Sequence, residues 1–163
     1  MKNFDVVFES DNIIFTKLSI LLVNDYLKMI NDPNVANKIS HKIHTYTYDE
    51  EINWINDKLN KKAIFFSMLE KGTNEFIGNI ELKLRNNGAE IGISITPDKQ
   101  NKHYGREALK TIIKYGIDVL KLEDFDLNVY SNNPRAIACY EHVGFVKDGI
   151  GKEQDDIHMK YMR

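Results

Sequence analysis

Two strand-to-helix junctions between residues 90 and 145 constrain the fold most. The strand-like run Glu90–Thr96 leads into Gln100–Arg106 and an amphipathic helix, and the run Phe125–Tyr130 leads into Asn133–Ala136. The start of a helix exposes unpaired backbone N–H groups and the positive end of the helix dipole. A basic, glycine-containing turn at such a start suits a pyrophosphate group. The sequence therefore predicts an α/β fold in which two helix starts are rich in hydrogen-bond donors.

The order of these junctions resembles the GNAT superfamily of N-acetyltransferases, which use acetyl-CoA. The family's pyrophosphate signature is Q/R-x-x-G-x-G/A, and Gln100, Tyr104 and Gly105 stand at the expected places, whereas His103 replaces the first glycine. A Cβ at that position crowds the phosphates or forces a strained dihedral angle. The second signature, N-x-x-A-x-x-x-Y followed by G-F, is complete in this chain. It consists of Asn133, Ala136, Tyr140, Gly144 and Phe145.

The resemblance covers nearly all of the chain and follows the layout of the ribosomal-protein alanine acetyltransferase branch. It implies a mixed, mainly antiparallel central sheet flanked by helices, in which the parallel strands ending at Thr96 and Tyr130 splay into a V. It also implies acetyl-CoA as acetyl donor, direct transfer in a ternary complex, and no metal. The implied cofactor-binding residues are Ile93, Ser94, Ile95, Gln100, Asn101, Lys102, His103, Tyr104, Gly105, Arg106, Asn133, Arg135, Ala136 and Tyr140.

Acetyl transfer to an amine calls for two proton-handling groups. Bringing a lysine-like amine to its neutral form at pH 7 costs about 4–5 kcal/mol, which calls for a general base. Glu90 is the candidate base, with a solvent-facing strand-edge glutamate as the alternative. Other family members carry the base twelve residues before the tyrosine, where this chain has Asn128, which cannot titrate. Tyr140 is the candidate acid that protonates the CoA thiolate, with a half-buried packing role as the alternative.

Further residues are assigned to binding. The backbone N–H groups of Ile93–Ile95 are the candidate oxyanion donors, because the splay frees them. Asn133 would hold the pantetheine by its side chain, although N-capping explains this residue nearly as well. Lys102, Arg106 and Arg135 are placed to meet phosphates, although most such cations on a helix surface are only solvated.

Composition limits the remaining classes of function. The chain has 163 residues and a net charge of −2, so no global field attracts nucleic acid or an anionic membrane. We expect one domain over residues 1–163 and a cytoplasmic location, because we find neither a signal peptide nor a run of about 18 apolar residues. Cys139 is the single cysteine, which excludes an internal disulfide and a multi-thiolate metal site. We expect it to be a small buried packing residue.

Local patterns predict the other elements. Thr47 and Glu50 form a capping box for a helix whose apolar face carries Ile52, Ile55 and Leu59. Asn87-Gly88 predicts a type I′ hairpin. The other strands are expected over residues 13–18, 63–70, 75–84, 145–150 and 157–162, and the other helices over residues 21–30, 35–39, 105–120 and 133–144.

The sequence does not identify the acetyl acceptor. His41 and His44 have no third ligand nearby, which favours loop residues over a metal site. Tyr46 and Tyr48 favour exposed or site-lining positions, and Trp54 favours the core. The acidic run 152–156 either attracts a cationic amine or is a solvated hairpin tip.

We predict a small-molecule amine or a protein N-terminus as acceptor, no nucleic-acid or membrane partner, and a homodimer slightly favoured over a monomer. A catalytically silent acyl-CoA-binding sensor is the alternative function. A nucleotide-phosphate-binding module is disfavoured because G-x-x-x-x-G-K-[ST] is absent.

Overall fold

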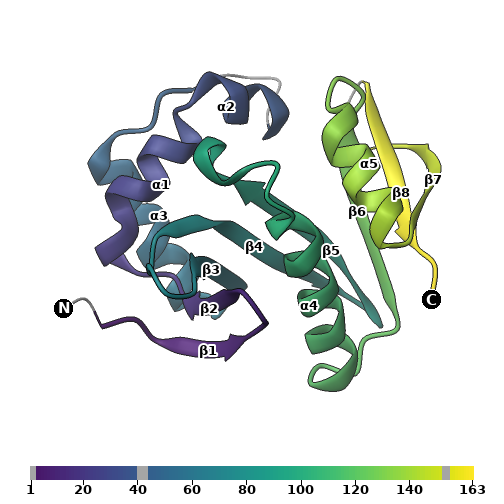
Figure 1. The fold of residues 1–163 in the computed structure, drawn as a ribbon, viewed down its shortest axis with the longest axis horizontal. Coiled ribbons are helices and arrows are strands. Elements are labelled where there is room, and N and C mark those ends of the chain that lie inside the picture. Colours follow the sequence, from purple (N-terminus) through teal and green to yellow (C-terminus); the bar gives the residue numbers. More distant parts are fainter. Residues whose placement is uncertain (1–2, 40–43, 152–154) are drawn as a thin grey trace.

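One mixed sheet forms the centre of the molecule (Figure 1). The computed structural model describes residues 3–39, 44–151 and 155–163. Within them, eight strands lie in the order β1-β2-β3-β4-β5-β6-β8-β7, and neighbouring strands are antiparallel except for the parallel pair β5 and β6. The predicted mixed, mainly antiparallel sheet is confirmed. The strands are β1 (Val6–Glu9), β2 (Ile13–Lys17), β3 (Ile64–Glu70), β4 (Phe76–Arg85), β5 (Gly88–Ile95), β6 (Asp124–Tyr130), β7 (Phe145–Ile150) and β8 (Asp156–Tyr161).

Helices cover both faces of the sheet (Figure 1). The helices are α1 (Val23–Ile30), α2 (Pro33–Ile39), α3 (Tyr48–Asn60), α4 (Tyr104–Asp118) and α5 (Pro134–Val143), with 3₁₀ turns η1 (Ile20–Leu22) and η2 (Pro97–Lys99). On one face α4 and α5 lie against each other, and on the other face α1 and α3 do so. In the described part of the chain, every helix is too short or too polar to cross a membrane.

Two apolar cores lie on the two faces. Under α4, Leu109 joins Phe15 and Ile80 of the sheet in one cluster. Under α1 and α3, Tyr26 and Ile55 belong to a second cluster. Because successive side chains of a strand point to opposite faces, this division assigns the residues of β5, β6 and β8, and those of β4 from Ile80 onward, to one face. We call these faces the α4 face and the α1 face.

Short-range sequence signals place several element boundaries. The Thr47 hydroxyl accepts from the Glu50 N–H and the Glu50 carboxylate accepts from the Thr47 N–H, both at 3.2 Å, which confirms the capping box. A hairpin joins β4 to β5 as predicted, but its turn residues are Asn86 and Asn87, because Gly88 already pairs with Arg85 in the sheet. Of these turn residues only Asn86 has a positive φ, of 26°, so the predicted type I′ turn at Asn87-Gly88 is wrong.

Two features differ from the prediction. No sequence pattern predicts β1, whose four residues are mostly exposed. In α3, Ile55 is buried as predicted, but Leu59 is 43% exposed and Glu51 is only 3% exposed. Glu51 and Ile55 are four residues apart and share a helix face, so a carboxylate occupies a place that apolar periodicity gives to a hydrophobic residue.

The parallel strands β5 and β6 part after a short pairing. Residues 88–90 pair with residues 124–126. A Cβ at Gly88 would lie 2.5 Å from the Asp124 carbonyl oxygen, so the first pair requires glycine. Beyond Glu90, β5 continues beside β4 and β6 continues beside β8. This arrangement agrees with the predicted V-shaped splay (Figure 1).

Candidate active site

The start of α4 presents a row of backbone donors. Within the described residues, the N–H groups of residues 101–106 have no hydrogen-bond acceptor, and the Glu107 N–H donates to the His103 carbonyl at 3.3 Å. The row lies at the positive end of a 15-residue helix. Consecutive free N–H groups at a helix start suit an anionic phosphate. The segment Gln100–Arg106 therefore fits a diphosphate by its own geometry.

His103 has a backbone conformation that favours glycine. Its φ is 67° and its ψ is 10°, and Asn101 in the same turn has a φ of 62°. A residue with a side chain in this left-handed region costs about 1–2 kcal/mol. The strained dihedral angle expected at His103 is therefore present, and the turn keeps a backbone shape to which glycine is suited.

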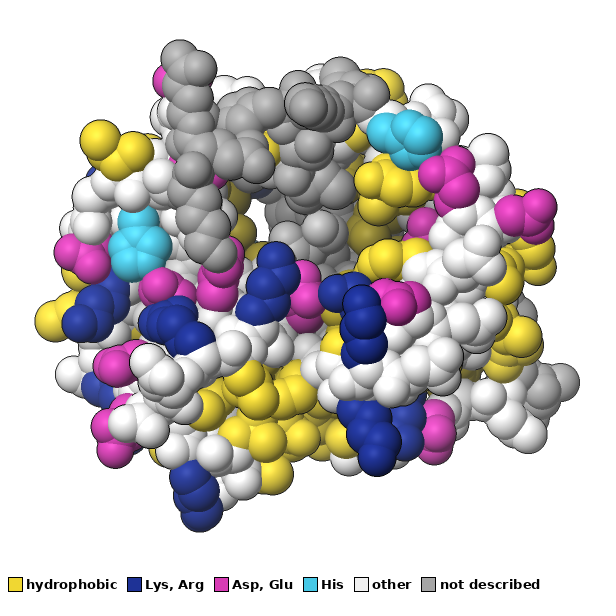
Figure 2. Space-filling model, turned by 180° about the vertical axis from the view of Figure 1, so that it is seen from behind, with side chains coloured by type: hydrophobic (Ala, Val, Ile, Leu, Met, Phe, Trp, Pro, Cys, Tyr) yellow, Lys and Arg dark blue, Asp and Glu magenta, His cyan; other side chains and the backbone are white. Residues whose placement is uncertain are grey.

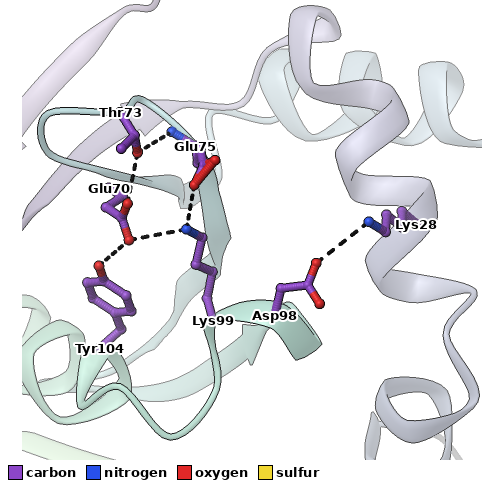
Figure 3. A network of polar contacts seen from close by, with 7 residues as sticks. All are labelled: Lys28, Glu70, Thr73, Glu75, Asp98, Lys99 and Tyr104. Atoms are coloured by element: carbon purple, nitrogen blue, oxygen red, sulfur yellow. Dashed lines mark hydrogen bonds and ion pairs between the residues drawn. The ribbon is translucent and has the colours of Figure 1, made fainter.

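A network centred on one carboxylate holds the start of α4 (Figure 3). Glu70, at the end of β3, accepts a hydrogen bond from the Tyr104 hydroxyl. Lys99 donates to the same carboxylate at 3.2 Å and to Glu75 at 2.7 Å. These contacts tie both ends of residues 100–103 to the hairpin between β3 and β4. Glu70 and Lys99, which belong to neither sequence signature, thus hold the candidate phosphate-binding turn in place.

Hydrogen bonding keeps the network charged. The hydrogen bond from Tyr104 is the largest of the causes that lower the pKa of Glu70 from 4.5 to about 2. Burial, followed by the bond to Glu70, raises the pKa of Tyr104 to about 12. The Tyr104 hydroxyl therefore has a structural partner, which the signature does not indicate. Glu70 and Lys99 carry no sequence signal for this role, because their proximity depends on how the hairpin packs beside the turn.

The start of α5 leaves the Asn133 side chain available. Asn133 is the N-cap by position and Pro134 follows it, but the Asn133 side chain makes no capping hydrogen bond. N-capping by the side chain is therefore wrong, and pantetheine binding stays a prediction. Ala136 packs at the edge of the core under α4, and Arg135 is exposed.

Tyr140 lies on the side of α5 that faces this core. Its partly buried ring meets Phe145 edge-on, with 6.2 Å between the ring centroids. Among the described residues, no hydrogen-bond partner is found for its hydroxyl. Burial, followed by the neighbouring Cys139, raises the pKa of the Tyr140 phenol. The phenol therefore stays protonated at neutral pH, and it can donate to a ligand.

Strand geometry divides the predicted oxyanion donors. The Thr96 N–H donates to the Ile77 carbonyl of β4 at 2.8 Å. Because N–H groups of alternate residues in a strand point the same way, the Ser94 N–H also points toward β4. The N–H groups of Ile93 and Ile95 point toward the side from which β6 has parted. They keep the predicted role, whereas the geometry removes the Ser94 N–H from it.

Glu90 stands at the last paired position of β5, on the α1 face. Asn128 Nδ2 donates to Glu90 Oε2 at 3.1 Å, which links β6 to β5 where their pairing ends. Because an ionised carboxylate only accepts, the amide nitrogen must face Glu90. Asn128 Oδ1 is then buried without a donor among the described residues. Glu90 is partly buried, and its role as base stays a prediction.

A histidine and a carboxylate flank this pair. His158 Nε2 lies 2.6 Å from Asp126 Oδ2, and Arg85 Nη1 lies 2.5 Å from Asp126 Oδ1. Asp126 is the register partner of Glu90, and His158 of β8 is the register partner of Asn128. No sequence pattern marks His158 and Asp126, because their proximity arises only from the register of separate strands.

The two candidate catalytic residues lie on opposite faces of the sheet. Tyr140 belongs to the α4 face, and Glu90 to the α1 face. Figure 2 shows the molecule from the side opposite to Figure 1, with charged side chains across its middle. The parting of β5 and β6 lies between the two residues in the fold, which suits a reaction that takes its two reactants from different sides.

The other predicted residues are dispersed. Lys102 lines a separate cavity of about 580 Å³ that reaches α1 and the β3–β4 hairpin. Arg106 lies close enough to Cys139 to lower its pKa, although burial raises it more. Cys139 is half-buried beside the core, less deeply than expected. His44 pairs with Glu50 at 2.8 Å.

His41 and residues 152–154 lie outside the described residues. Among those described, no group of three or more His, Cys, Asp and Glu side chains could hold a metal ion. That no metal is needed stays a prediction.

Comparison with known proteins agrees with the fold. Residues 12–146 match the family model of the acetyltransferase (GNAT) domain. A spermidine N(1)-acetyltransferase of Vibrio cholerae is 30% identical over 118 residues, which cover 71% of this chain and 68% of that protein. The uncharacterized N-acetyltransferase p20 of Bacillus licheniformis is 30% identical over 108 residues, which cover 64% of this chain and 61% of that protein.

Solved structures show the same fold. An acetyltransferase of the GNAT family from Bacillus anthracis superposes with a TM-score of 0.83 at 21% identity, covering 94% of this chain and 96% of that chain. Spermidine N-acetyltransferase from Vibrio cholerae, in complex with CoA and spermine, superposes with a TM-score of 0.82 at 24% identity, covering 93% and 95%.

These findings define the class. The chain belongs to the GNAT family of N-acetyltransferases. The narrower resemblance to the ribosomal-protein alanine acetyltransferase branch stays a prediction.

Proposed function

We propose that the protein transfers the acetyl group of acetyl-CoA directly to a primary amine of a small cationic molecule, and that a polyamine is the first class to test. The observation that carries this proposal is the contact between Glu90 and Asn128 where β5 and β6 part. The similarity to the spermidine N(1)-acetyltransferase of Vibrio cholerae supports an acceptor of this class. A protein N-terminus as acceptor is the second candidate.

The residues divide the work between the two faces. The donors of residues 101–106 and the Asn133 side chain would hold acetyl-CoA, which supplies a thioester when bound. The N–H groups of Ile93 and Ile95 would stabilise negative charge on the acetyl oxygen. Glu90 would take a proton from the amine, directly or through water, and Tyr140 would give its phenolic proton to the leaving sulfur.

The charge of the α1 face supports a cationic acceptor. Glu81 and Glu90 both belong to this face and are partly buried, and Lys58 and Lys83 lie 3.9 and 3.8 Å from the Glu81 carboxylate. Asp126 also faces this side, although Arg85 and His158 already contact it. Glu90, which stands where β5 and β6 part, is therefore the carboxylate that would attract an ammonium group toward the splay.

The test is a panel of amines with acetyl-CoA, with release of the CoA thiol as readout. The panel contains spermidine, spermine, an aminoglycoside and a peptide with an N-terminal alanine. Turnover with the polyamines supports the proposal, and turnover with the peptide alone replaces it by protein N-terminal acetylation. If acetyl-CoA raises the melting temperature but no amine is acetylated, the catalytically silent acyl-CoA sensor is the better description.

A further inference from the structure

A cavity lies between α1 and the first half of α3, separate from the splay. Its volume is about 380 Å³, at the small end of ligand-binding pockets. In Figure 1, α1 and α3 lie on the left, and β5 and β6 lie to the right. We call this cavity between α1 and α3 the Glu51 cavity. Its lining residues are Ile30, Tyr46, Glu50, Glu51, Asn53 and Trp54.

The carboxylate of Glu51 is the unusual feature of this cavity. Glu51 is 3% exposed, yet within the described residues no hydrogen bond or ion pair reaches its side chain. Burial, followed by the charge of Glu50, raises the pKa of Glu51. Buried carboxylates are normally paired, because an uncompensated charge is costly to desolvate. An unpaired carboxylate lining a cavity therefore points to a donor supplied by a ligand.

Among the described residues, Glu50, unlike Glu51, has hydrogen-bond partners for its carboxylate within the protein. One of its oxygens accepts from the Thr47 N–H, and the other lies 2.8 Å from His44 Nε2. Its charge adds to the negative potential of the cavity, but each of its oxygens already has a partner within the protein. Glu51 is thus the side chain that is free to accept from a ligand.

The aromatic walls are held in place before any ligand arrives. Asn31 fixes Tyr46 with two hydrogen bonds to its backbone, at 2.8 and 2.9 Å. Trp54 meets Phe65 edge-on at 5.1 Å and Tyr26 edge-on at 6.3 Å between ring centroids. Aromatic rings beside a carboxylate attract cations, and a preformed wall lowers the entropic cost of binding.

We propose that the Glu51 cavity is a second binding site, which takes the ammonium group and short alkyl chain of a small organic cation. The Glu51 carboxylate accepts from the ammonium N–H groups, and Tyr46, Trp54 and Ile30 cover the chain. Two glutamates repel phosphates, so acetyl-CoA is excluded from the cavity. Because Glu90 is not among the residues that line the cavity, binding there does not depend on the proposed transfer reaction.

The test uses the single tryptophan of the chain, Trp54, which lines the cavity. n-Butylammonium chloride is titrated into the protein at constant ionic strength, and Trp54 fluorescence and the melting temperature are followed. 1-Butanol is the uncharged counterpart of the probe. Saturable changes with n-butylammonium and none with 1-butanol are expected. Equal responses to both compounds, or no response of either readout to the ammonium, would overturn the proposal.

Three variants locate the binding. Glu51→Gln removes the charge with little change of shape and should weaken binding at least about tenfold, because it removes a charge-assisted hydrogen bond. Asp57→Asn removes the same charge from an exposed position of the same helix and should bind as wild type does. Asn53→Lys places a competing cation from an exposed position, so it should also weaken binding.

Glu51→Gln and Asn53→Lys each give a result that can contradict the proposal. If Glu51→Gln folds and titrates within twofold of wild type, the carboxylate does not bind the ammonium and the proposal is wrong. If Glu51→Gln does not fold, Asn53→Lys takes its place, and unchanged binding in that variant overturns the proposal in the same way.

Discussion

Tyr140→Phe is the substitution that tests the chemistry of the site most directly. It removes one oxygen and keeps the ring that meets Phe145. Within the described residues this hydroxyl has no hydrogen-bond partner, so its removal orphans no buried group. We therefore expect the free energy of unfolding to change by less than about 0.5 kcal/mol. Any large loss of activity then comes from the reaction.

The expected loss follows from the role of the phenol. General acid catalysis is typically worth about 10²- to 10⁴-fold, so the barrier should rise by about 2.7–5.4 kcal/mol at 1.36 kcal/mol for each tenfold. The loss should fall on kcat, because a proton donor acts in the transition state, and the affinity for acetyl-CoA should hardly change. Initial rates of CoA release at saturating amine, with calorimetric binding of acetyl-CoA, separate these quantities.

The raised pKa of Tyr140 also predicts how the loss of kcat depends on pH. Because the phenol stays protonated beyond its ordinary range, the ratio of wild-type to Tyr140→Phe kcat should stay constant between about pH 6 and pH 10. Tyr161→Phe is the matched control, since Tyr161 packs against the same Phe145 at 5.4 Å from a different element. A kcat within about twofold of wild type in folded Tyr140→Phe, or a similar loss in Tyr161→Phe, would refute the assignment of Tyr140 as acid.

Four other outcomes are expected. Glu90→Gln should lower kcat at neutral pH and less at alkaline pH, where the amine loses its proton in bulk water; a kcat–pH profile parallel to wild type removes Glu90 from the mechanism. His103→Gly should raise the free energy of unfolding by about 0.5–1 kcal/mol in denaturant melts, because it relieves a left-handed φ, and weaker acetyl-CoA binding by the variant would show that the imidazole contacts the ligand. The folded-state pKa of Glu70 is lowered, so its contribution to stability is present above about pH 4.5 and lost toward about pH 2; thermal melts of wild type and Glu70→Gln should converge over that window. The folded-state pKa of Glu51 is raised, so the sign is opposite: Glu51→Gln should melt higher than wild type at pH 7, and the gap should close as acid protonates the carboxyl.

The predictable part of the site consists of segments that carry their own geometry. Residues 101–106 form a donor-rich helix start because a turn, a glycine and an amphipathic helix follow one another in the sequence. Tyr140 is oriented by its place on a short amphipathic helix that begins at Pro134, directly after Asn133. Such features depend on spacing within one segment, and a pattern of residues is enough to find them.

The unpredicted part consists of contacts between segments. Glu70 meets Tyr104 across 34 residues, and Asp126 meets His158 across 32 residues. Each side chain alone is an ordinary surface carboxylate, phenol or imidazole in the sequence. Their pairing depends on strand register, and a shift of one residue would turn each strand side chain to the other face of the sheet.

The separation of Tyr140 and Glu90 by the sheet explains why the short β5–β6 pairing matters. If the two strands paired along their whole length, backbone hydrogen bonds would close the path between the acid on the α4 face and the carboxylate on the α1 face. Because pairing ends at Glu90, the N–H groups of Ile93 and Ile95 are turned toward the opening instead of toward a strand. In the proposed mechanism the same interruption would supply the passage for the acetyl group and the donors for its oxygen. The function of the site therefore depends on where a strand pairing stops, as much as on which side chains flank it.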